Sequence, residues 1–283
     1  MRRIALFLLT NIAVLILLSI VCHLFGIDQM AASRGYGGMG GAFISLAISK
    51  WMAKWSTGAR VIAQPQNETE RWLLDTVRQH AQHAGIGMPE VAIYDAPEMN
   101  AFATGMSKNN ALVAVSSGLL QQMDREQIKA VLGHEIGHIA NGDMVTLTLI
   151  QGVLNTLVIL AARIVGRAVD SWLSGGRDNR GGGIGYFVVV MVLQIVFGLF
   201  ASMIVAAFSR WREFRADQAG AQFAGRSAMI SALQRLKVNH GESTLPNTIA
   251  AFGISGPLAE GFKRLFMSHP PLDERIAALQ NAQ

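Results

Sequence analysis

The stretch Gly133-His134-Glu135-Ile136-Gly137-His138 carries the pattern H-E-x-x-H, and the rest of the chain is interpreted around it. Apolar residues recur at helical spacing through this region, which predicts a helix over about residues 125–140. Residues four apart lie on one face of a helix, so His134 and His138 are placed to bind one metal ion. Glu135 follows the first histidine and is placed to act on a bound water molecule. The pattern predicts a zinc hydrolase site that still needs a third protein ligand.

The ends and the glycines of this helix support a defined structure. Asp124 and Gln127 have the spacing of a capping box at its start, and Asn141-Gly142-Asp143 predicts its end. Each interior glycine costs about 1 kcal/mol relative to alanine. Gly133 and Gly137 therefore predict that another part of the chain comes close to the metal-binding helix.

Composition indicates a membrane protein. The 283 residues are 51% hydrophobic and 15% charged, with a mean hydropathy of +0.32, whereas soluble domains carry about 25% charged residues. The net charge of +5 does not predict a nucleic-acid partner, because lysine and arginine are scattered and lie mainly beside apolar runs. Cys22 is the single cysteine and lies in an apolar run, which excludes an intramolecular disulfide and a cysteine zinc ligand.

Residues 1–55 are predicted to form a pair of transmembrane helices. The first span, residues 4–27, has no acidic residue, lysine or arginine. Cleavage as a signal peptide is the alternative, but the apolar core is too long and no A-x-A site follows it. The second span, residues 36–51, is weaker and rich in glycine; Gly37 and Gly41 have the spacing of a close helix contact, and a flexible loop is the alternative. Basic residues before the first span and after the second place both ends of this pair in the cytoplasm.

Residues 56–143 are predicted to be exposed to water on the cytoplasmic side. A helix and two strands of a small sheet are expected at residues 68–84, 91–94 and 112–115. His80 and His83 are expected to be solvated on the polar side of that helix. An edge of the sheet offers main-chain hydrogen bonds to an extended peptide, although a purely supporting sheet fits the pattern equally well.

Residues 144–209 are predicted to form a hydrophobic hairpin. Residues 144–162 are uncharged, and residues 186–209 form a second run of 24 residues without a charge. An exposed loop rich in glycine and arginine, residues 163–185, is expected between them. The arginines of this loop would lie on the outer side of the membrane, against the positive-inside rule. The hairpin is therefore expected either to cross the bilayer fully or to enter it only in part. Either path returns the chain to the side that holds the histidines.

The third metal ligand is therefore expected in residues 210–283. Glu213 and Asp217 are four apart and share a helical face. One carboxylate is expected to bind zinc while the other holds a ligating histidine through its free ring nitrogen. The alternative is a solvated helix in which both acids pair with Arg212 and Arg215.

The ordered motifs resemble those of the HtpX-type membrane metalloproteases, relatives of the CaaX prenyl proteases. Besides H-E-I-G-H, they include Asn-Gly-Asp at 141–143, E-F-R-A-D at 213–217, N-A-F-A-T-G at 100–105, S-H-P-P at 268–271 and E-R-I at 274–276. The resemblance covers nearly the whole chain. It implies one zinc ion bound by His134, His138 and Glu213, with Glu135 as the catalytic base and Asp217 supporting a ligand. It also implies a bacterial inner-membrane enzyme whose site faces the cytoplasm and acts on damaged or misfolded membrane proteins.

The predicted fold is mainly α and integral to the membrane, with about four transmembrane helices and a cytoplasmic zincin-like α+β metalloprotease domain that contains a small sheet. The predicted partners are the lipid bilayer and protein substrates. His269 is the candidate donor to the oxyanion, because the family places a His-Pro pair near the metal; a packing or capping role is the alternative. Arg275 is expected to dock the last helix by pairing with an acid. A chaperone or scaffold with a structural zinc has no use for Glu135, and a transporter would need ionisable residues within its spans.

Overall fold

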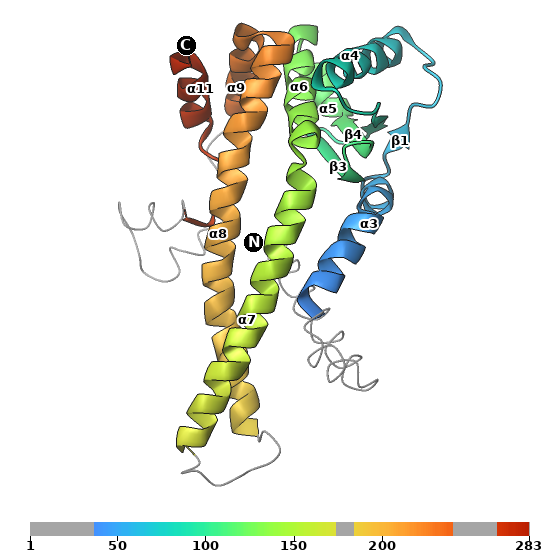
Figure 1. Cartoon of the computed structure of the whole chain (residues 1–283). Helices are drawn as coiled ribbons and strands as arrows, with labels where there is room; N and C mark the ends of the chain where they lie inside the picture. The colour runs from blue at the N-terminus through green and yellow to red at the C-terminus, as the bar shows by residue number, and fades with distance from the viewer. Residues whose placement is uncertain (1–36, 174–183, 240–264, 283) are drawn as a thin grey trace. The chain divides into compact units, whose positions relative to one another are not determined.

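A computed structural model describes residues 37–173, 184–239 and 265–282 of the chain (Figure 1). The described elements are, in chain order, α3 (Gly37–Thr57), β1 (Arg60–Val61), α4 (Glu68–Ala84), β2 (Glu90–Tyr94), β3 (Ala101–Ser107), β4 (Asn110–Ser116), α5 (Ser117–Gln122), α6 (Arg125–Asn141), α7 (Asp143–Leu173), α8 (Ile184–Ala224), α9 (Arg226–Asn239) and α11 (Leu272–Asn281). The predicted span at residues 4–27 and Cys22 lie outside the described residues.

The described residues form two compact units. Residues 37–42, 151–173 and 184–202 belong to the first unit, and residues 43–150, 203–239 and 265–282 belong to the second. The helices α3, α7 and α8 each run from one unit into the other. All described strands and the H-E-x-x-H helix α6 are in the second unit, which we call the sheet unit.

The sheet unit contains a four-stranded sheet in the order β1-β2-β4-β3. β2 and β4 are parallel, while β1 and β3 pair antiparallel to β2 and β4. The predicted strands at residues 91–94 and 112–115 lie within β2 and β4, which are buried. β1 and β3 were not predicted by the residue pattern, because β1 has two residues and β3 is an edge strand with an irregular register between Gly105 and Ser107.

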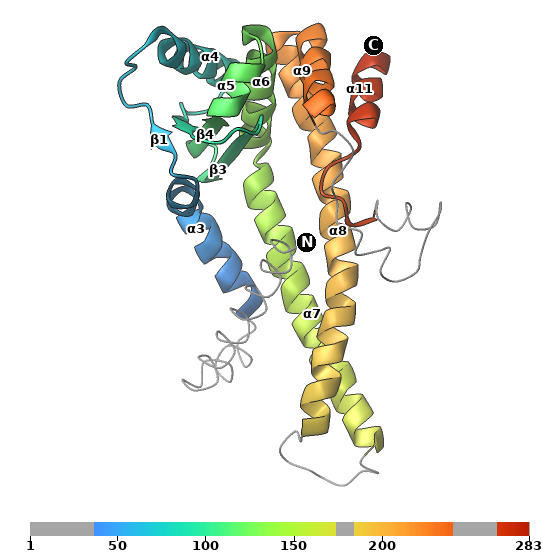
Figure 2. The same cartoon turned by 180° about the vertical axis from the view of Figure 1, so that it is seen from behind.

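The core of the sheet unit surrounds α6. Figures 1 and 2 show α4 beside α6 on the side of the sheet, with α9 on the other side, and all three contribute to one apolar cluster. Its fully buried members include Leu73 of α4, Val113 of β4, Leu132 and Ile136 of α6 and Leu233 of α9. The predicted helix at residues 68–84 is confirmed as α4, and the last helix, which carries Arg275, is α11.

The prediction for His80 was wrong. Its residue is 1% exposed, its Nε2 donates a hydrogen bond to the Lys129 carbonyl at 3.0 Å, and its ring stacks on Phe223 at 5.5 Å. Burial lowers the pKa of His80, although the bond to the Lys129 carbonyl opposes that shift. The helix pattern did not reveal this burial, because Phe223 belongs to α8 and is far away in sequence. His83 is exposed, as predicted.

Two described helices are long and apolar enough to cross a membrane. They are residues 143–172 of α7 and residues 186–224 of α8, with mean hydropathies of 1.9 and 2.7, and almost none of their most apolar windows is buried inside the protein. Both helices extend into the predicted loop at 163–185: α7 continues to Leu173 and α8 begins at Ile184. The protein is therefore mostly helical, with a small mixed sheet and two candidate membrane helices among the residues described.

α3 differs from the predicted span at residues 36–51. It continues to Thr57, and the two candidate membrane helices among the described residues do not include it. The lysines of its last turns are bonded to the sheet: Lys50 and Lys54 lie 2.7 and 3.2 Å from the Glu90 carboxylate. A Cβ atom on Gly41 would meet no described atom within 4 Å, so the described residues do not form the close contact expected at this glycine.

Candidate metal centre

The helix α6 holds both histidines of the motif on one buried face. The capping box at its start is confirmed, since Asp124 accepts from the Gln127 amide at 2.8 Å and the Gln127 side chain accepts from the Asp124 amide. The helix ends at Gly142, whose φ of 68° is a left-handed conformation that glycine adopts without strain. His134 and His138 are each 8% exposed, and their Nε2 atoms are 3.1 Å apart.

The glycines of α6 allow α8 to approach closely, which confirms the prediction of a close neighbour. A Cβ atom on Gly133 would lie 3.1 Å from the Cα atom of Gly220, and one on Gly137 would lie 2.7 Å from the Cβ atom of Ala219. Gly220 faces back in the same way, with the Ala130 carbonyl 3.0 Å from its own hypothetical Cβ atom. Small residues on both helices therefore bring the carboxylates of α8 next to the histidines of α6.

Glu213 completes a cluster of three potential metal ligands. Its Oε1 lies 3.3 Å from His138 Nε2 and its Oε2 lies 3.7 Å from His134 Nε2, and ligand atoms of the three residues lie within 4.8 Å of one another. Glu213 is 1% exposed, and its Oε1 accepts no well-aligned hydrogen bond from the described residues. A buried carboxylate oxygen normally has a partner, so this unsatisfied atom beside two imidazole nitrogens fits a metal ion.

The outer nitrogen of each histidine is bonded to a carboxylate. His134 Nδ1 is 2.9 Å from Asp217 Oδ1, and His138 Nδ1 is 2.7 Å from Asp143 Oδ2. When Nδ1 donates its hydrogen to a carboxylate, the lone pair of Nε2 is directed into the cluster and is available to a metal. Asp217 therefore makes a contact with a histidine of the kind that the resemblance implied for it. The contact of Asp143 was not predicted, because its motif was interpreted as a helix end; the turn at Gly142 brings this first residue of α7 back to His138.

Arg275 of α11 joins the acids of this centre. Its Nε donates to Asp217 Oδ2 at 2.7 Å, and its Nη1 lies 3.3 Å from Glu213 Oε2. Burial opposes the charge of Arg275, but the bonds to Asp217 and the nearby Glu213 and Glu135 carboxylates outweigh burial and raise its pKa. The expected pairing with an acid is present, and it places α11 directly against the residues that support the metal ligands.

The segment before α11 brings His269 to the same carboxylate. His269 Nδ1 is 2.9 Å from Glu213 Oε2, and its side chain is 62% exposed. Arg210, one turn before Glu213 on α8, donates to the Met267 carbonyl at 2.7 Å and so holds this segment in place. Of the acids and histidines predicted for the site, His269 is the one that is largely open to solvent.

The charges of the centre favour a protonated His138 when no metal is bound. Burial acts to lower the pKa of His138, but hydrogen bonds to Asp143 and Glu213 and the charge of Glu135 outweigh it and raise the pKa to about 9. The ring must lose this proton before its Nε2 can bind a metal ion, so metal binding at neutral pH releases a proton. Glu135 is 8% exposed and lies beside His134 in the chain.

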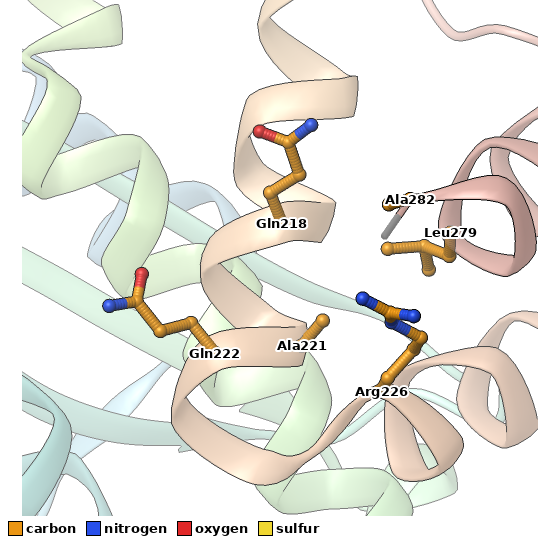
Figure 3. A pocket seen from close by; sticks show the side chains of 6 residues that line it. All are labelled: Gln218, Ala221, Gln222, Arg226, Leu279 and Ala282. Atoms are coloured by element: carbon orange, nitrogen blue, oxygen red, sulfur yellow. The ribbon is translucent and has the colours of Figure 1, made fainter.

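A separate pocket lies further along α8 (Figure 3). It has a volume of about 600 Å³ and is lined by Gln218, Ala221, Gln222, Arg226, Leu279 and Ala282. Figure 3 shows these side chains on α8, at the start of α9 and at the end of α11. The lining contains no histidine or carboxylate side chain, so this pocket is distinct from the metal centre.

Comparisons with known proteins agree with this arrangement. The model of peptidase family M48 matches residues 67–283. Protease HtpX of Xanthomonas euvesicatoria pv. vesicatoria (strain 85-10) is 62% identical over 289 residues, covering 99% of this chain and 98% of that protein. Protease HtpX of Stenotrophomonas maltophilia (strain R551-3) is 63% identical over 283 residues, covering 98% of this chain and 97% of the relative.

A solved structure shows the same fold. The crystal structure of S. mikatae Ste24p matches with a TM-score of 0.60 at 18% sequence identity. The match covers 93% of this chain but 58% of the Ste24p chain, so the present chain spans little more than half of that protein.

Proposed function

The chain belongs to peptidase family M48 and is a membrane metalloprotease, and from this premise we propose that its metal is a single zinc ion bound by His134, His138 and Glu213. The observation that carries the proposal is the convergence of these three side chains within 4.8 Å in a buried site. Two imidazoles and one carboxylate are a ligand set of catalytic zinc, which keeps a fourth position for water. Asp217 and Asp143 fix the two rings in the orientation that zinc requires.

The residues around this site fit peptide hydrolysis. Zinc, when bound, supplies Lewis acidity and lowers the pKa of a bound water to about 7. Glu135 accepts a proton from the attacking water and gives it to the departing amine. His269 is exposed and adjacent to Glu213, from where its ring donates a hydrogen bond to the oxyanion of the tetrahedral intermediate. Asp217 and Arg275 hold His134 in position without contacting the substrate.

The substrate is proposed to bind as an extended peptide along β3. This strand is the edge of the sheet, and among the described residues no other strand pairs with its outer side. β3 also packs against α6, which carries His134, Glu135 and His138. An added strand would therefore receive main-chain hydrogen bonds beside the metal ligands, and such bonds do not depend on the substrate sequence.

The proposed location is the bacterial inner membrane, with the site on the cytoplasmic side. Residues 1–55 would contribute two membrane helices and residues 144–209 two more, leaving residues 56–143 and 210–283 as the cytoplasmic protease region. Arginines at the end of the apolar run of α8 agree with that orientation. Glu213 follows this run by four residues, so the site is close to the membrane surface and suits misfolded or damaged membrane proteins as substrates.

Substitution of the proposed base tests the function directly. Wild type and Glu135→Gln, purified in detergent with zinc, are incubated with casein or a loosely folded membrane protein, and cleavage is followed on gels. We expect the variant to keep its zinc and to lose about 10²- to 10⁴-fold in rate. Equal cleavage by the two proteins would exclude Glu135 as the base. If the wild type bound zinc but cleaved neither substrate, the result would favour a scaffold protein with a structural metal.

A further inference from the structure

The pocket of Figure 3 lies within the sheet unit and has no part in the proposed peptide hydrolysis. Its volume of about 600 Å³ is in the range of small-molecule sites, about 300–1,000 Å³. One side of the lining is apolar, because Leu279 is buried in the main apolar cluster of the unit and Ala221 packs against that cluster. The rest of the lining is polar and includes the side chain of Arg226. We call this pocket the α8–α11 pocket.

Arg226, the first residue of α9, supplies the positive charge of this pocket. In Figure 3 its guanidinium is directed from the start of α9 into the space between α8 and α11, and it has no hydrogen bond or ion pair with any described residue. The other basic side chains of α9 are bonded: Arg235 donates to the Gln122 carbonyl at 3.0 Å, and Lys237 donates to Asp273 at 2.6 Å. Neither the pocket lining nor the first turn of α9 contains an acidic residue. A guanidinium in a pocket without a carboxylate favours an anionic ligand.

The other lining groups indicate what kind of anion fits. A guanidinium is planar and pairs with a carboxylate through two parallel hydrogen bonds. Ala221, Leu279 and Ala282 offer apolar contact, and the exposed carboxamides of Gln218 and Gln222 each offer a donor and an acceptor. An inorganic anion would leave the apolar and amide groups unused. The lining therefore fits an organic acid that carries an apolar group and an amide, which is the chemistry of an acylated amino acid and of the C-terminal residue of a peptide.

The pocket lies one helical turn from the ion pair that supports the metal ligands. Arg275 Nε donates to Asp217 Oδ2 at 2.7 Å, and Asp217 Oδ1 is 2.9 Å from His134 Nδ1. Ala221 follows Asp217 by four residues on α8, and Leu279 follows Arg275 by four residues on α11. Each pocket residue therefore lies on the same helical face as a member of the ion pair, in the next turn. A ligand between these two faces acts on the contact between α8 and α11 that positions His134.

We propose that the α8–α11 pocket binds an organic acid of this class through Arg226, and that the bound acid holds α11 against α8 so that Arg275 keeps its contact with Asp217. The carboxylate of the ligand pairs with the guanidinium, and its apolar group contacts Leu279. The site is separate from the metal centre and goes beyond the proposed peptidase activity. Because Asp217 orients a metal ligand, occupancy of the pocket should slow the loss of metal without any contact between the acid and the metal.

Titration with a matched acid and amide tests the ligand class. N-acetyl-leucine and N-acetyl-leucinamide are titrated by calorimetry into full-length, zinc-loaded protein in detergent. We expect the amide to bind about 10- to 100-fold more weakly than the acid, because it cannot form the hydrogen bonds of a charged carboxylate. Arg226→Gln should weaken binding of the acid by a similar factor. Arg78→Gln removes the same charge from α4, where Arg78 pairs with Asp75, and should leave the affinity unchanged. A pentapeptide that ends in leucine distinguishes the sources: tighter binding than N-acetyl-leucine identifies a peptide C-terminus, and equal binding identifies a free acid.

Transfer of zinc to a chelator tests the effect on the metal centre, and it does not require cleavage of any substrate. Saturating N-acetyl-leucine should slow the transfer several-fold in wild type and in Arg78→Gln, and should have no effect in Arg226→Gln.

Three results would overturn the proposal. Equal affinity for the acid and the amide, or an unchanged affinity for the acid in Arg226→Gln, would exclude an anion site at this pocket. Equal slowing of zinc transfer in wild type and Arg226→Gln would mean that the acid binds at the metal itself. Unchanged transfer in wild type at saturation would exclude an effect of the pocket on the contact between Arg275 and Asp217.

Discussion

The two halves of α8 differ in what surrounds them. Up to Ser209 the helix has no charged side chain, and its most apolar window has no residue buried inside the protein. After that point Glu213, Asp217 and Gly220 are buried against α6 and α11. The first half can face lipid over much of its surface, since a helix satisfies its own backbone groups, although Val190 packs on Gly166 of α7. The second half carries charges that require specific partners, so substitutions there should have far larger effects.

The largest effect is expected at Glu213, the proposed metal ligand on the half of α8 that follows Ser209. Glu213→Gln keeps the size of the side chain but removes its negative charge, so the site should lose most of its zinc and activity should fall to background. Zinc per chain is measured by atomic absorption and cleavage on casein. Glu126→Gln, an exposed acid in the first turn of α6, is the control and should change neither quantity. If Glu213→Gln kept its full zinc content, the third metal ligand would be a residue other than Glu213.

A smaller loss is expected when a supporting charge is removed. Arg275→Gln leaves Asp217 buried without its cation, and the loss of such support typically weakens metal affinity or activity about 10- to 100-fold. Zinc affinity is measured by competition with a chelator. Lys237→Gln breaks another ion pair to α11, with Asp273, but both partners are more than half exposed and the effect should be within about 1 kcal/mol. Similar losses in both variants would mean that Arg275 only docks α11.

Glycines on the two halves of α8 offer a matched steric comparison. A Cβ atom on Gly220 would lie 2.6 Å from Met229 Sδ and 3.0 Å from the Ala130 carbonyl, whereas one on Gly198 would meet no atom of the described residues within 4 Å. Gly220→Leu should therefore push α8 away from α6, destabilise the protein by about 1–3 kcal/mol and reduce zinc content. Gly198→Leu should be tolerated, because its side chain would face lipid. Thermal melting in detergent measures both, and equal destabilisation would show that the lipid-facing half is also tightly packed.

The sequence predicted the parts of the site that depend on short spacings. The helix over Arg125–Asn141, its capping box and the pairs His134/His138 and Glu213/Asp217 follow from residues three or four apart. The need for a close neighbour at Gly133 also followed, because a glycine inside a helix has a cost that packing must offset. These features are local, so they can be derived without knowing the fold.

The features that were missed depend on contacts between distant segments. Asp143 supports His138 only because Gly142 turns the chain back, and His80 is buried only because α4 packs against α6 and Phe223. The weak pattern of β3 reflects an edge strand that pairs on one side. The predicted segment at residues 36–51 ended too early for a related reason. Lys50 and Lys54 indicated an end of the helix near the membrane surface, but in the structure they form ion pairs with Glu90 of the sheet and α3 continues past them.

The smallest effect concerns pH and the C-terminal end of α8. His80 stacks on Phe223 there, and burial lowers its pKa in the folded protein below the value of about 6.5 in an unfolded chain. The unfolded chain then binds the proton more readily, so this contribution to stability is complete above about pH 6.5 and is lost as the pH falls below it. His80→Gln keeps an N–H donor for the Lys129 carbonyl but cannot be charged, so it should reduce the acid sensitivity of the melting temperature.

The comparison of melting temperatures at about pH 7.5 and about pH 5.5 measures this difference, because an unperturbed histidine titrates between them. Protonation of the metal ligands also contributes to acid sensitivity, but it is common to both proteins and cancels in the comparison. His83→Gln is the matched control, since His83 also stacks on Phe223, at 6.5 Å, but is exposed to solvent. It should retain most of the acid sensitivity of the wild type, because burial is the largest cause that lowers the pKa of His80 and the charge of His83 is the smallest. If His80→Gln showed the same pH response as the wild type, the packing of α8 against α4 would adapt to a charged His80 ring. The C-terminal end of α8 would then be held less rigidly than the part of α8 that carries Glu213 and Asp217.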